Sequence, residues 1–245
     1  PALAAATDAG WSFDSQLTFS AFQTLLSRIL AHKACGLDGF QIDFLHNASP
    51  AFLRHYHRLL LQCMQHATFP AAWSAVVAVL LPKKTPAPTR VDLLRDIWLT
   101  TTGSRIVGSF VREHVFKPLD TRLLFSQAGF RAGRQTLEHV QELHLAIHNA
   151  LKLHANIYVL WVDLEKCFMT FPREAGLSTI ARCGAPPEVV TALRGLYADA
   201  TGRYDSAHGM CDPFHILRGF LQGAVESPDF AKFCINVLME IMELK

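Results

Sequence analysis

Two short apolar runs, far apart in the chain, place the strongest constraint on the fold. Residues 75–81 and 157–162 are continuous runs rich in β-branched residues and Leu. Runs of this length and composition predict strands that are buried on both faces. Around them, apolar residues recur at helical spacing over 19–32, 50–66, 104–124, 135–153, 173–183 and 187–197. Helices combined with a few separated strands favour an α+β fold.

The helix expected over 135–153 has a well-defined apolar side. We expect this side to face the protein core. Its members are Leu137, Val140, Leu143, Ala146, Ile147 and Leu151.

Composition indicates a globular chain with an uneven charge distribution. Half of the 245 residues are hydrophobic, which is enough for a sizeable core, and the formal net charge is only +2. From Pro82 to Arg134 there are ten Lys or Arg against four acids, whereas from Gln135 onward nine bases face thirteen acids. This distribution suits a protein that binds phosphates on one surface and cations on another. Taken alone, the charge distribution favours the alternative, which is ordinary surface charge.

Cysteine usage and hydropathy point to an intracellular protein without a membrane partner. The six cysteines lie far apart without a C-x-x-C pair, so we expect them to be reduced. No apolar run near the middle of the chain approaches the roughly 20 residues that span a bilayer, and no basic leader precedes the apolar N-terminus. The chain begins with Pro1 and stops inside an apolar helical run, so we expect a fragment of a longer protein.

Asp163 is the residue with the clearest chemical potential. It follows the apolar run 157–162, so its carboxylate is expected at the end of a strand, where a hard cation can be held. Mg²⁺ typically takes one or two carboxylates together with substrate phosphates, so one Asp alone is insufficient. The alternative is a structural Asp at a strand end or helix N-cap. A zinc site at His144 and His148 is disfavoured because the pair has neither the intervening Glu of H-E-x-x-H nor a third ligand.

Five segments carry a resemblance to a known family. They are Gly36-Leu-Asp-Gly39; the stretch from Trp73 to Leu99 with Leu-Pro82-Lys83-Lys84 and Arg95; Gln127-Ala-Gly-Phe-Arg131-Ala-Gly-Arg134; Val162-Asp163-Leu164-Glu-Lys166-Cys-Phe168 continuing to Arg173; and Gly219-x-x-Gln222-Gly223-x-x-x-Ser227-Pro228. In this order they resemble the reverse transcriptases of non-LTR (LINE-type) retrotransposons, and the last two resemble the first and second palm motifs of that family.

The resemblance implies a right-hand polymerase fold. It would comprise fingers and a partial palm, with helices packed on a small, mostly antiparallel sheet. Residues 1–18 would be an N-terminal extension or linker, 19–155 a fingers-like region and 156–245 the partial palm. The implied activity is RNA-directed DNA polymerisation by two-metal nucleotidyl transfer, with Mg²⁺ as cofactor and Mn²⁺ as the alternative ion. The implied partners are an RNA template, a DNA primer and deoxynucleoside triphosphates, and the implied compartment is the nucleus.

The resemblance also implies a role for each matching residue. Asp163 would be the catalytic metal ligand, assisted by the Leu164 backbone carbonyl, and Phe168 would lie under the sugar and reject a 2′-hydroxyl. Further residues would bind the nucleotide, namely Lys83, Lys84, Arg95, Gln222 and Gly223, since cationic donors suit phosphate oxygens and Gly permits close backbone approach. The nucleic-acid strands would be contacted by Arg131, Arg134 and Lys166.

Several positions depart from the family pattern. Met169 stands where the family usually has Asp, Cys167 where it has Ala, Asp96 where it has Pro, and Leu221 where a basic residue is common. The paired Asp of the third palm motif is missing, and Tyr197-Ala-Asp-Ala200 does not replace it because it precedes the Gln-Gly segment and has Ala200 at the second Asp. The chain alone is therefore expected to be inactive. Two rivals remain, a non-catalytic remnant that retains some nucleic-acid binding, and an RNA-directed RNA polymerase.

Overall fold

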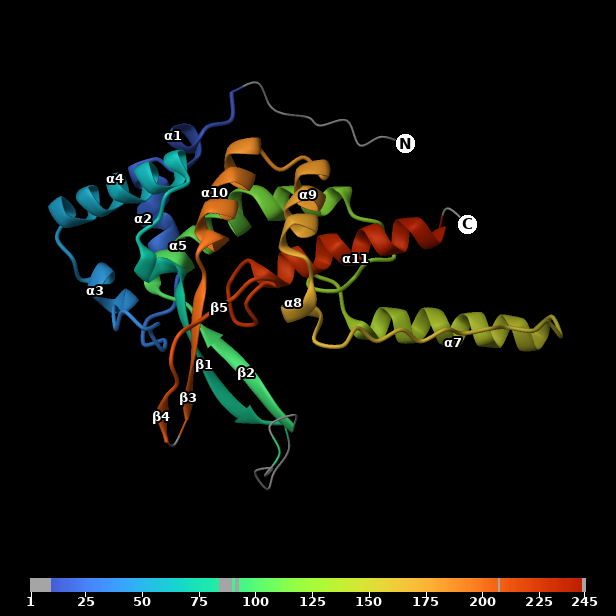
Figure 1. The fold of residues 1–245 in the computed structure, drawn as a ribbon. Coiled ribbons are helices and arrows are strands. Elements are labelled where there is room, and N and C mark those ends of the chain that lie inside the picture. The colour runs from blue at the N-terminus through green and yellow to red at the C-terminus, as the bar shows by residue number, and fades with distance from the viewer. Residues whose placement is uncertain (1–9, 84–89, 91–92, 207, 244–245) are drawn as a thin grey trace.

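The computed structural model describes residues 10–83, 90, 93–206 and 208–243 (Figure 1). The α-helices are α1 (Phe13–Gln16), α2 (Phe19–Arg28), α3 (Ile42–His46), α4 (Pro50–His66), α5 (Thr102–Val111), α6 (Lys117–Leu119), α7 (Thr136–Lys152), α8 (Cys167–Thr170), α9 (Arg173–Arg182), α10 (Pro187–Ala198) and α11 (Ser227–Glu243). Short 3₁₀ turns cover Ala71–Ser74 and Asp120–Arg122, and a π-helical turn covers Arg112–Phe116. The strands are β1 (Ala75–Pro82), β2 (Leu94–Leu99), β3 (Thr201–Ser206), β4 (Gly209–Met210) and β5 (Phe214–His215).

The five described strands form one small mixed sheet, so the α+β class is confirmed. Its order is β2-β1-β3-β4, and β5 also pairs with β3. β1 is antiparallel to β2, with Val77 opposite Leu99, and parallel to β3, with Ala75 opposite Thr201. The predicted strand at 75–81 therefore forms, and it lies inside the sheet, as its continuous apolar run requires.

A single hydrophobic cluster joins the helices to the sheet. α4 packs on α10, α2 on α5, and α9 on both α10 and α11. The fully buried large side chains of the cluster come from helices, sheet and loops alike, and include Phe22, Leu60, Trp98, Phe110, Phe116, Phe220, Phe230 and Phe233. The core thus draws on both the first half and the second half of the chain.

One predicted helix contains a π-helical turn. The pattern over 104–124 predicted a helix, and the chain is helical from α5 through the π-turn Arg112–Phe116 into α6, with right-handed helical backbone at each junction. Pro118 lies in this stretch, has no N–H to donate, and brings a ring that collides with a carbonyl four residues earlier in a regular helix. The wider π-turn places Val115 and Phe116 in the core.

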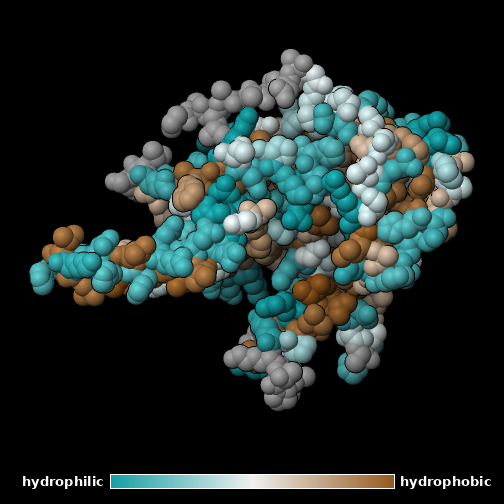
Figure 2. Space-filling view, turned by 180° about the vertical axis from the view of Figure 1, so that it is seen from behind, coloured by the Kyte–Doolittle hydropathy of each residue, from teal (hydrophilic) through white to brown (hydrophobic). Residues whose placement is uncertain are grey.

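The region 136–164 differs most from expectation. The predicted helix 135–153 forms as α7, but it has no buried residue, so the prediction that its apolar side faces the core is wrong. The predicted strand 157–162 pairs with no strand in the described part of the chain; Tyr158, Leu160 and Trp161 are 90%, 83% and 80% exposed. Figure 1 shows α7 projecting from the body with the following chain running back along it, and Figure 2 shows hydrophobic side chains along the projection. We call residues 136–164 the arm.

None of the helices in the described part of the chain combines the length and the apolar character needed to cross a bilayer.

Candidate functional site

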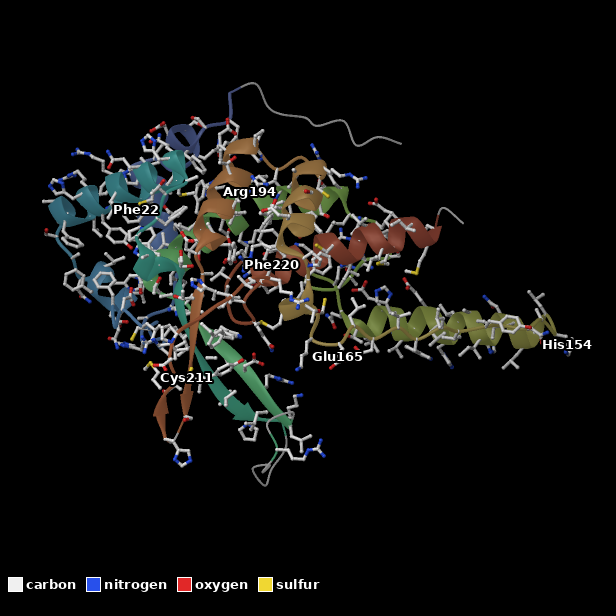
Figure 3. All side chains as sticks on the ribbon, viewed as in Figure 1. Phe22, His154, Glu165, Arg194, Cys211 and Phe220 are labelled. Atoms are coloured by element: carbon white, nitrogen blue, oxygen red, sulfur yellow. The ribbon has the colours of Figure 1, made fainter. Side chains whose placement is uncertain are left out.

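Asp163 lies at the base of the arm, just before α8. Its side chain is exposed, and the chain turns there into the short helix Cys167–Thr170. Lys166 caps this helix with a left-handed backbone (φ 47°), and its carbonyl accepts hydrogen bonds from the Met169 and Thr170 amides at 2.9 and 3.1 Å. Figure 3 marks the place by the neighbouring Glu165. The carboxylate of Asp163 is thus accessible to a ligand from solvent.

Two backbone hydrogen bonds join the first palm-like segment to the second. The Phe220 amide donates to the Phe168 carbonyl at 2.7 Å, and the Gly219 amide donates to the Phe171 carbonyl at 2.9 Å. Gly219 has φ 81°, and a Cβ there would lie 2.5 Å from the Met169 carbonyl oxygen, so glycine is required. Segments separated by about fifty residues in the printed sequence are therefore fixed side by side.

The Gln222–Gly223 turn lies against the edge strand β2. The Trp98 amide donates to the Gln222 carbonyl at 2.8 Å, and a Cβ at Gly223 would lie 2.5 Å from the Trp98 carbonyl oxygen. Gly223 also has φ 121°. Close backbone approach is thus the reason for glycine at this position, and the turn covers part of an otherwise open sheet edge.

Phe220 anchors this turn in the core. Its ring stacks on Phe230 of α11 with centroids 3.9 Å apart, meets Tyr197 edge-on at 5.9 Å, and lies where a Cβ on Gly176 would be 2.5 Å away (Figure 3). Leu221, at a position where the family commonly has a basic residue, is buried as well. The loop before Gln222 is therefore held by packing on α9, α10 and α11.

Arg173 is a residue whose importance the sequence did not reveal. Its guanidinium donates to the carbonyls of Tyr197 at 2.8 Å, Ile216 at 2.9 Å and Gly219 at 3.4 Å, and lies 5.1 Å from the centroid of the Tyr197 ring. Burial lowers the pKa of Arg173. The residue was visible as the last matching position of the first palm-like segment, but only the fold reveals that it connects α9, α10 and the loop leading to Gln222.

The predicted nucleotide-binding cations lie on the β1–β2 hairpin. Leu81 is opposite Arg95, and the Lys83 amide donates to the Leu93 carbonyl at 3.0 Å, so Lys83 and Arg95 lie near each other at the far end of the hairpin. Both residues are exposed. Lys84 lies outside the described residues. The same strand β2 carries Trp98, which places the hairpin and the Gln222 turn on one element.

Phe168 is half-buried and meets Phe130 edge-on, with ring centroids 6.0 Å apart. Phe130 belongs to the segment 127–134 and is 54% exposed with a left-handed backbone (φ 58°). This contact brings the third matching segment to the first palm-like one. The sequence did not indicate it.

Arg131 and Arg134 are engaged in holding their own loop. Arg131 donates to the carbonyls of Leu124 and Gln127, both at 2.8 Å, and to that of Asp120 at 3.1 Å. Arg134 pairs with Glu138 at 2.6 Å and donates to the Phe125 carbonyl at 2.8 Å. These bonds order the loop between the π-turn region and α7. Lys166, by contrast, is exposed on the surface beside Asp163.

The other departures from the family pattern have local structural explanations. Met169 packs against the hydrophobic core, so its apolar side chain fits its surroundings. Asp96 accepts a hydrogen bond from the Trp98 indole at 3.2 Å. Cys167 is half-buried, and desolvation raises the pKa of its thiol.

The donors at Asp163 suit a hard cation but are too few for a preformed metal site. The Asp163 carboxylate and the Leu164 carbonyl supply oxygen ligands of the kind that Mg²⁺ prefers. Among the residues that the structure describes, no group of three or more His, Cys, Asp or Glu is arranged to hold a metal ion.

Similarity to a known protein bears on the origin of the chain. No protein-family model matches the chain. The chain is similar to the transposon TX1 uncharacterized 149 kDa protein of Xenopus laevis, with 24% identity over 197 residues, which is 80% of this chain and 15% of the length of that protein. The similarity suggests a retrotransposon-derived protein.

Proposed function

We propose that this chain forms the fingers and part of the palm of a retroelement reverse transcriptase, an RNA-directed DNA polymerase. The observation that supports the proposal most directly is the junction of the segments around Phe168 and Phe220, with the Gln222–Gly223 turn bonded to Trp98. Segments that match palm motifs in sequence also meet in space. The similarity to a transposon protein agrees with this origin.

In the proposed enzyme each group has a distinct task. Asp163 and the Leu164 carbonyl would hold Mg²⁺, which when bound neutralises charge on the triphosphate. Lys83 and Arg95, on the hairpin that adjoins the Gln222 turn, would bind phosphate oxygens. Phe168, held edge-on by Phe130, would set the space available to the sugar.

The exposed run 157–162 supports the idea that the polymerase unit needs more polypeptide. The six apolar residues of this run pair with no strand among the residues that the structure describes, and they have the composition of a central strand. We propose that a further segment, carrying the paired Asp absent from this chain, pairs with this run in the complete protein and completes the metal site.

Primer extension tests the proposal. The protein encoded by the gene extended downstream to include the paired-Asp segment is assayed on poly-rA/oligo-dT with Mg²⁺ and either deoxynucleotides or ribonucleotides, beside Asp163→Ala. Extension that is lost in the variant supports a polymerase with Asp163 as metal ligand. Absence of extension in both proteins, when circular dichroism shows that both are folded, favours a non-catalytic remnant. Extension only with ribonucleotides favours an RNA-directed RNA polymerase.

The remnant is the second candidate function. Met169 in place of Asp favours it, because this position packs on the core and carries no charge. A remnant would retain nucleic-acid binding without nucleotide transfer.

A further inference from the structure

The loop 216–226, which connects β5 to α11 and carries the Gln222–Gly223 turn, ends at a buried acidic residue (Figure 1). Glu226 is 1% exposed, and its backbone carbonyl accepts a hydrogen bond from the Phe230 amide at 3.1 Å, at the start of α11. Its carboxyl group packs directly on α5, where a Cβ at Gly108 would collide with Oε2 of Glu226. A carboxyl group in such a place loses its hydration on folding and requires a compensating partner.

Tyr197 of α10 supplies that partner. Its hydroxyl donates a hydrogen bond to Oε1 of Glu226, and Tyr197 is itself only 3% exposed. Burial raises the pKa of both groups, so the folded protein favours their uncharged forms. The contact is therefore a hydrogen bond between two groups that the core has desolvated, and each of them depends on the other for a polar partner.

Arg173 connects this pair to the other end of the loop. Its guanidinium donates to the Tyr197 carbonyl and lies over the Tyr197 ring. The same guanidinium donates to two carbonyls at the start of the loop, those of Ile216 and Gly219. The loop is thus fixed at its start by Arg173 and at its end by the Tyr197 hydroxyl, and the Gln222–Gly223 turn lies between these two points.

The turn has little room for a different position. A Cβ at Gly223 would lie 2.5 Å from the Trp98 carbonyl oxygen, so turn and strand are in direct backbone contact. Phe220 and Leu221 pack the loop into the core, but apolar packing has no preferred direction. A hydrogen bond prefers both a distance and an angle. Loss of the Tyr197 hydroxyl should therefore loosen the turn while the apolar packing stays in place.

We infer that Tyr197 and Glu226 are positioning residues of the proposed nucleotide site, and that their hydrogen bond sets the place of the Gln222–Gly223 turn against Trp98. The identity of the site rests on the proposed function. The place of the turn does not, because the Trp98 amide, which donates to the Gln222 carbonyl at 2.8 Å, reports it without any activity. Both residues are buried, so they act through the turn and not by contact with a nucleotide.

Amide hydrogen exchange on the 245-residue chain tests the place of the turn. Tyr197→Phe leaves the Glu226 carboxyl without its donor, and the Trp98 amide is expected to exchange about tenfold faster. The amide of buried Leu25 in α2 is the internal reference for global opening. Tyr56→Phe is the matched control, because its half-buried ring lies on α4, and it is expected to leave Trp98 exchange unchanged. An equal change in both variants, or none in Tyr197→Phe, would overturn the inference.

Primer extension by the extended protein tests the functional consequence. In Tyr197→Phe the KM for the deoxynucleotide is expected to rise about fivefold while kcat stays within about twofold, because the turn is proposed to shape the nucleotide pocket and not to contact the reacting atoms. A role in stability alone predicts the opposite split, since fewer folded molecules lower the apparent kcat and leave KM unchanged. That second pattern would overturn the inference.

Substitutions at Glu226 provide an independent variant. Glu226→Gln keeps a carbonyl oxygen that accepts from Tyr197, so it should retain the wild-type KM and the wild-type Trp98 exchange. Glu226→Leu removes the acceptor and should reproduce the effects of Tyr197→Phe. In Tyr197→Phe/Glu226→Leu no buried polar group is left unpaired, so stability should recover while the raised KM and the fast exchange remain. This double variant also replaces Tyr197→Phe if the single variant fails to fold by circular dichroism. Recovery of KM and exchange together with stability would contradict a positioning role.

The two measurements separate the inference from the proposed function. An extended protein that does not polymerise, together with faster Trp98 exchange in Tyr197→Phe and unchanged exchange in Glu226→Gln, would refute the proposed activity and support the positioning of the turn. Polymerase activity with an unchanged KM in Tyr197→Phe would do the reverse.

Discussion

Arg173 should be one of the main stabilising residues around the proposed site. Its guanidinium spans three carbonyls from α10 and from the loop that leads to Gln222, and it also lies over the Tyr197 ring. Replacement by Ala leaves these carbonyls without a protein donor from this position. The loop 216–219 would then be held by the packing of Phe220, by the two backbone bonds to Phe168 and Phe171, and by the Ile216 amide, which donates to the Ala200 carbonyl at 2.8 Å.

The magnitude follows from the geometry. A hydrogen bond to a charged group contributes about 1.5–3 kcal/mol. Two of the three bonds are short, at 2.8 and 2.9 Å, and the third is long at 3.4 Å. Taking the lower end for a half-buried group and counting only the short bonds, Arg173→Ala is expected to lower the free energy of unfolding by about 3 kcal/mol. Arg173→Lys keeps the charge but cannot span both carbonyls, so about half of this loss should remain.

Urea unfolding monitored by circular dichroism measures these values. Arg194→Ala is the matched control, because Arg194 makes a bidentate pair with Glu174 that is largely exposed. Such surface pairs contribute less than about 1 kcal/mol. Amide hydrogen exchange provides a local measure, since the Gly219 and Phe220 amides should exchange faster in Arg173→Ala and not in Arg194→Ala. A loss below 1 kcal/mol for Arg173→Ala, or a loss no larger than that of Arg194→Ala, would refute the reasoning.

Three further predictions concern other parts of the molecule. Gly219→Ala should cost about 2 kcal/mol or more in urea unfolding, because it combines a left-handed backbone with a clash against the Met169 carbonyl; an unchanged midpoint would contradict this. Burial raises the pKa of Glu226 in the folded protein above its value in the unfolded chain, about 4.3. The contribution of Glu226 to the free energy of unfolding is therefore complete below about pH 4.3 and is lost as the pH rises through the higher pKa of the folded protein. Glu226→Gln should accordingly flatten the decline of the urea midpoint above that pH, and an identical pH profile would argue against a raised pKa. Trp161→Phe should remove the largest share of the acrylamide-quenchable fluorescence, since Trp161 is 80% exposed whereas Trp73 and Trp98 are buried and Trp11 is half-buried; unaltered quenching would place Trp161 in a protected environment.

Local signals explain which elements were predictable. Helix α4 begins at Pro50 after Ser49, whose hydroxyl accepts a hydrogen bond from the Phe52 amide. It ends at His66 and is followed by Ala67 as a left-handed C-cap. Pro at the first helical position and a Ser cap are written in the sequence. The run 75–81 likewise specifies β1, because a strand of that composition needs burial on both faces, and the chain supplies β2 and β3 as neighbours.

Elements that depend on distant partners were not predictable. The run 157–162 has the composition of a strand, but a strand forms only where another edge is available, and none pairs with it among the described residues. The apolar side of α7 similarly predicted burial without indicating what would cover it. The meeting of Phe168 with Phe130 and the bonds of Arg173 depend on loop geometry, which periodicity does not encode.

The arm also bears on how chains of this protein behave toward one another. Its run from Ile157 to Val162 contains neither charge nor Pro and is rich in aromatic and β-branched residues. An exposed segment of six such residues is a template for intermolecular β-pairing and aggregation. In a concentrated solution of this chain, the run can be covered by a segment of its own polypeptide or can pair with the same run of a neighbouring molecule. The faster of these two events would determine whether the protein stays soluble.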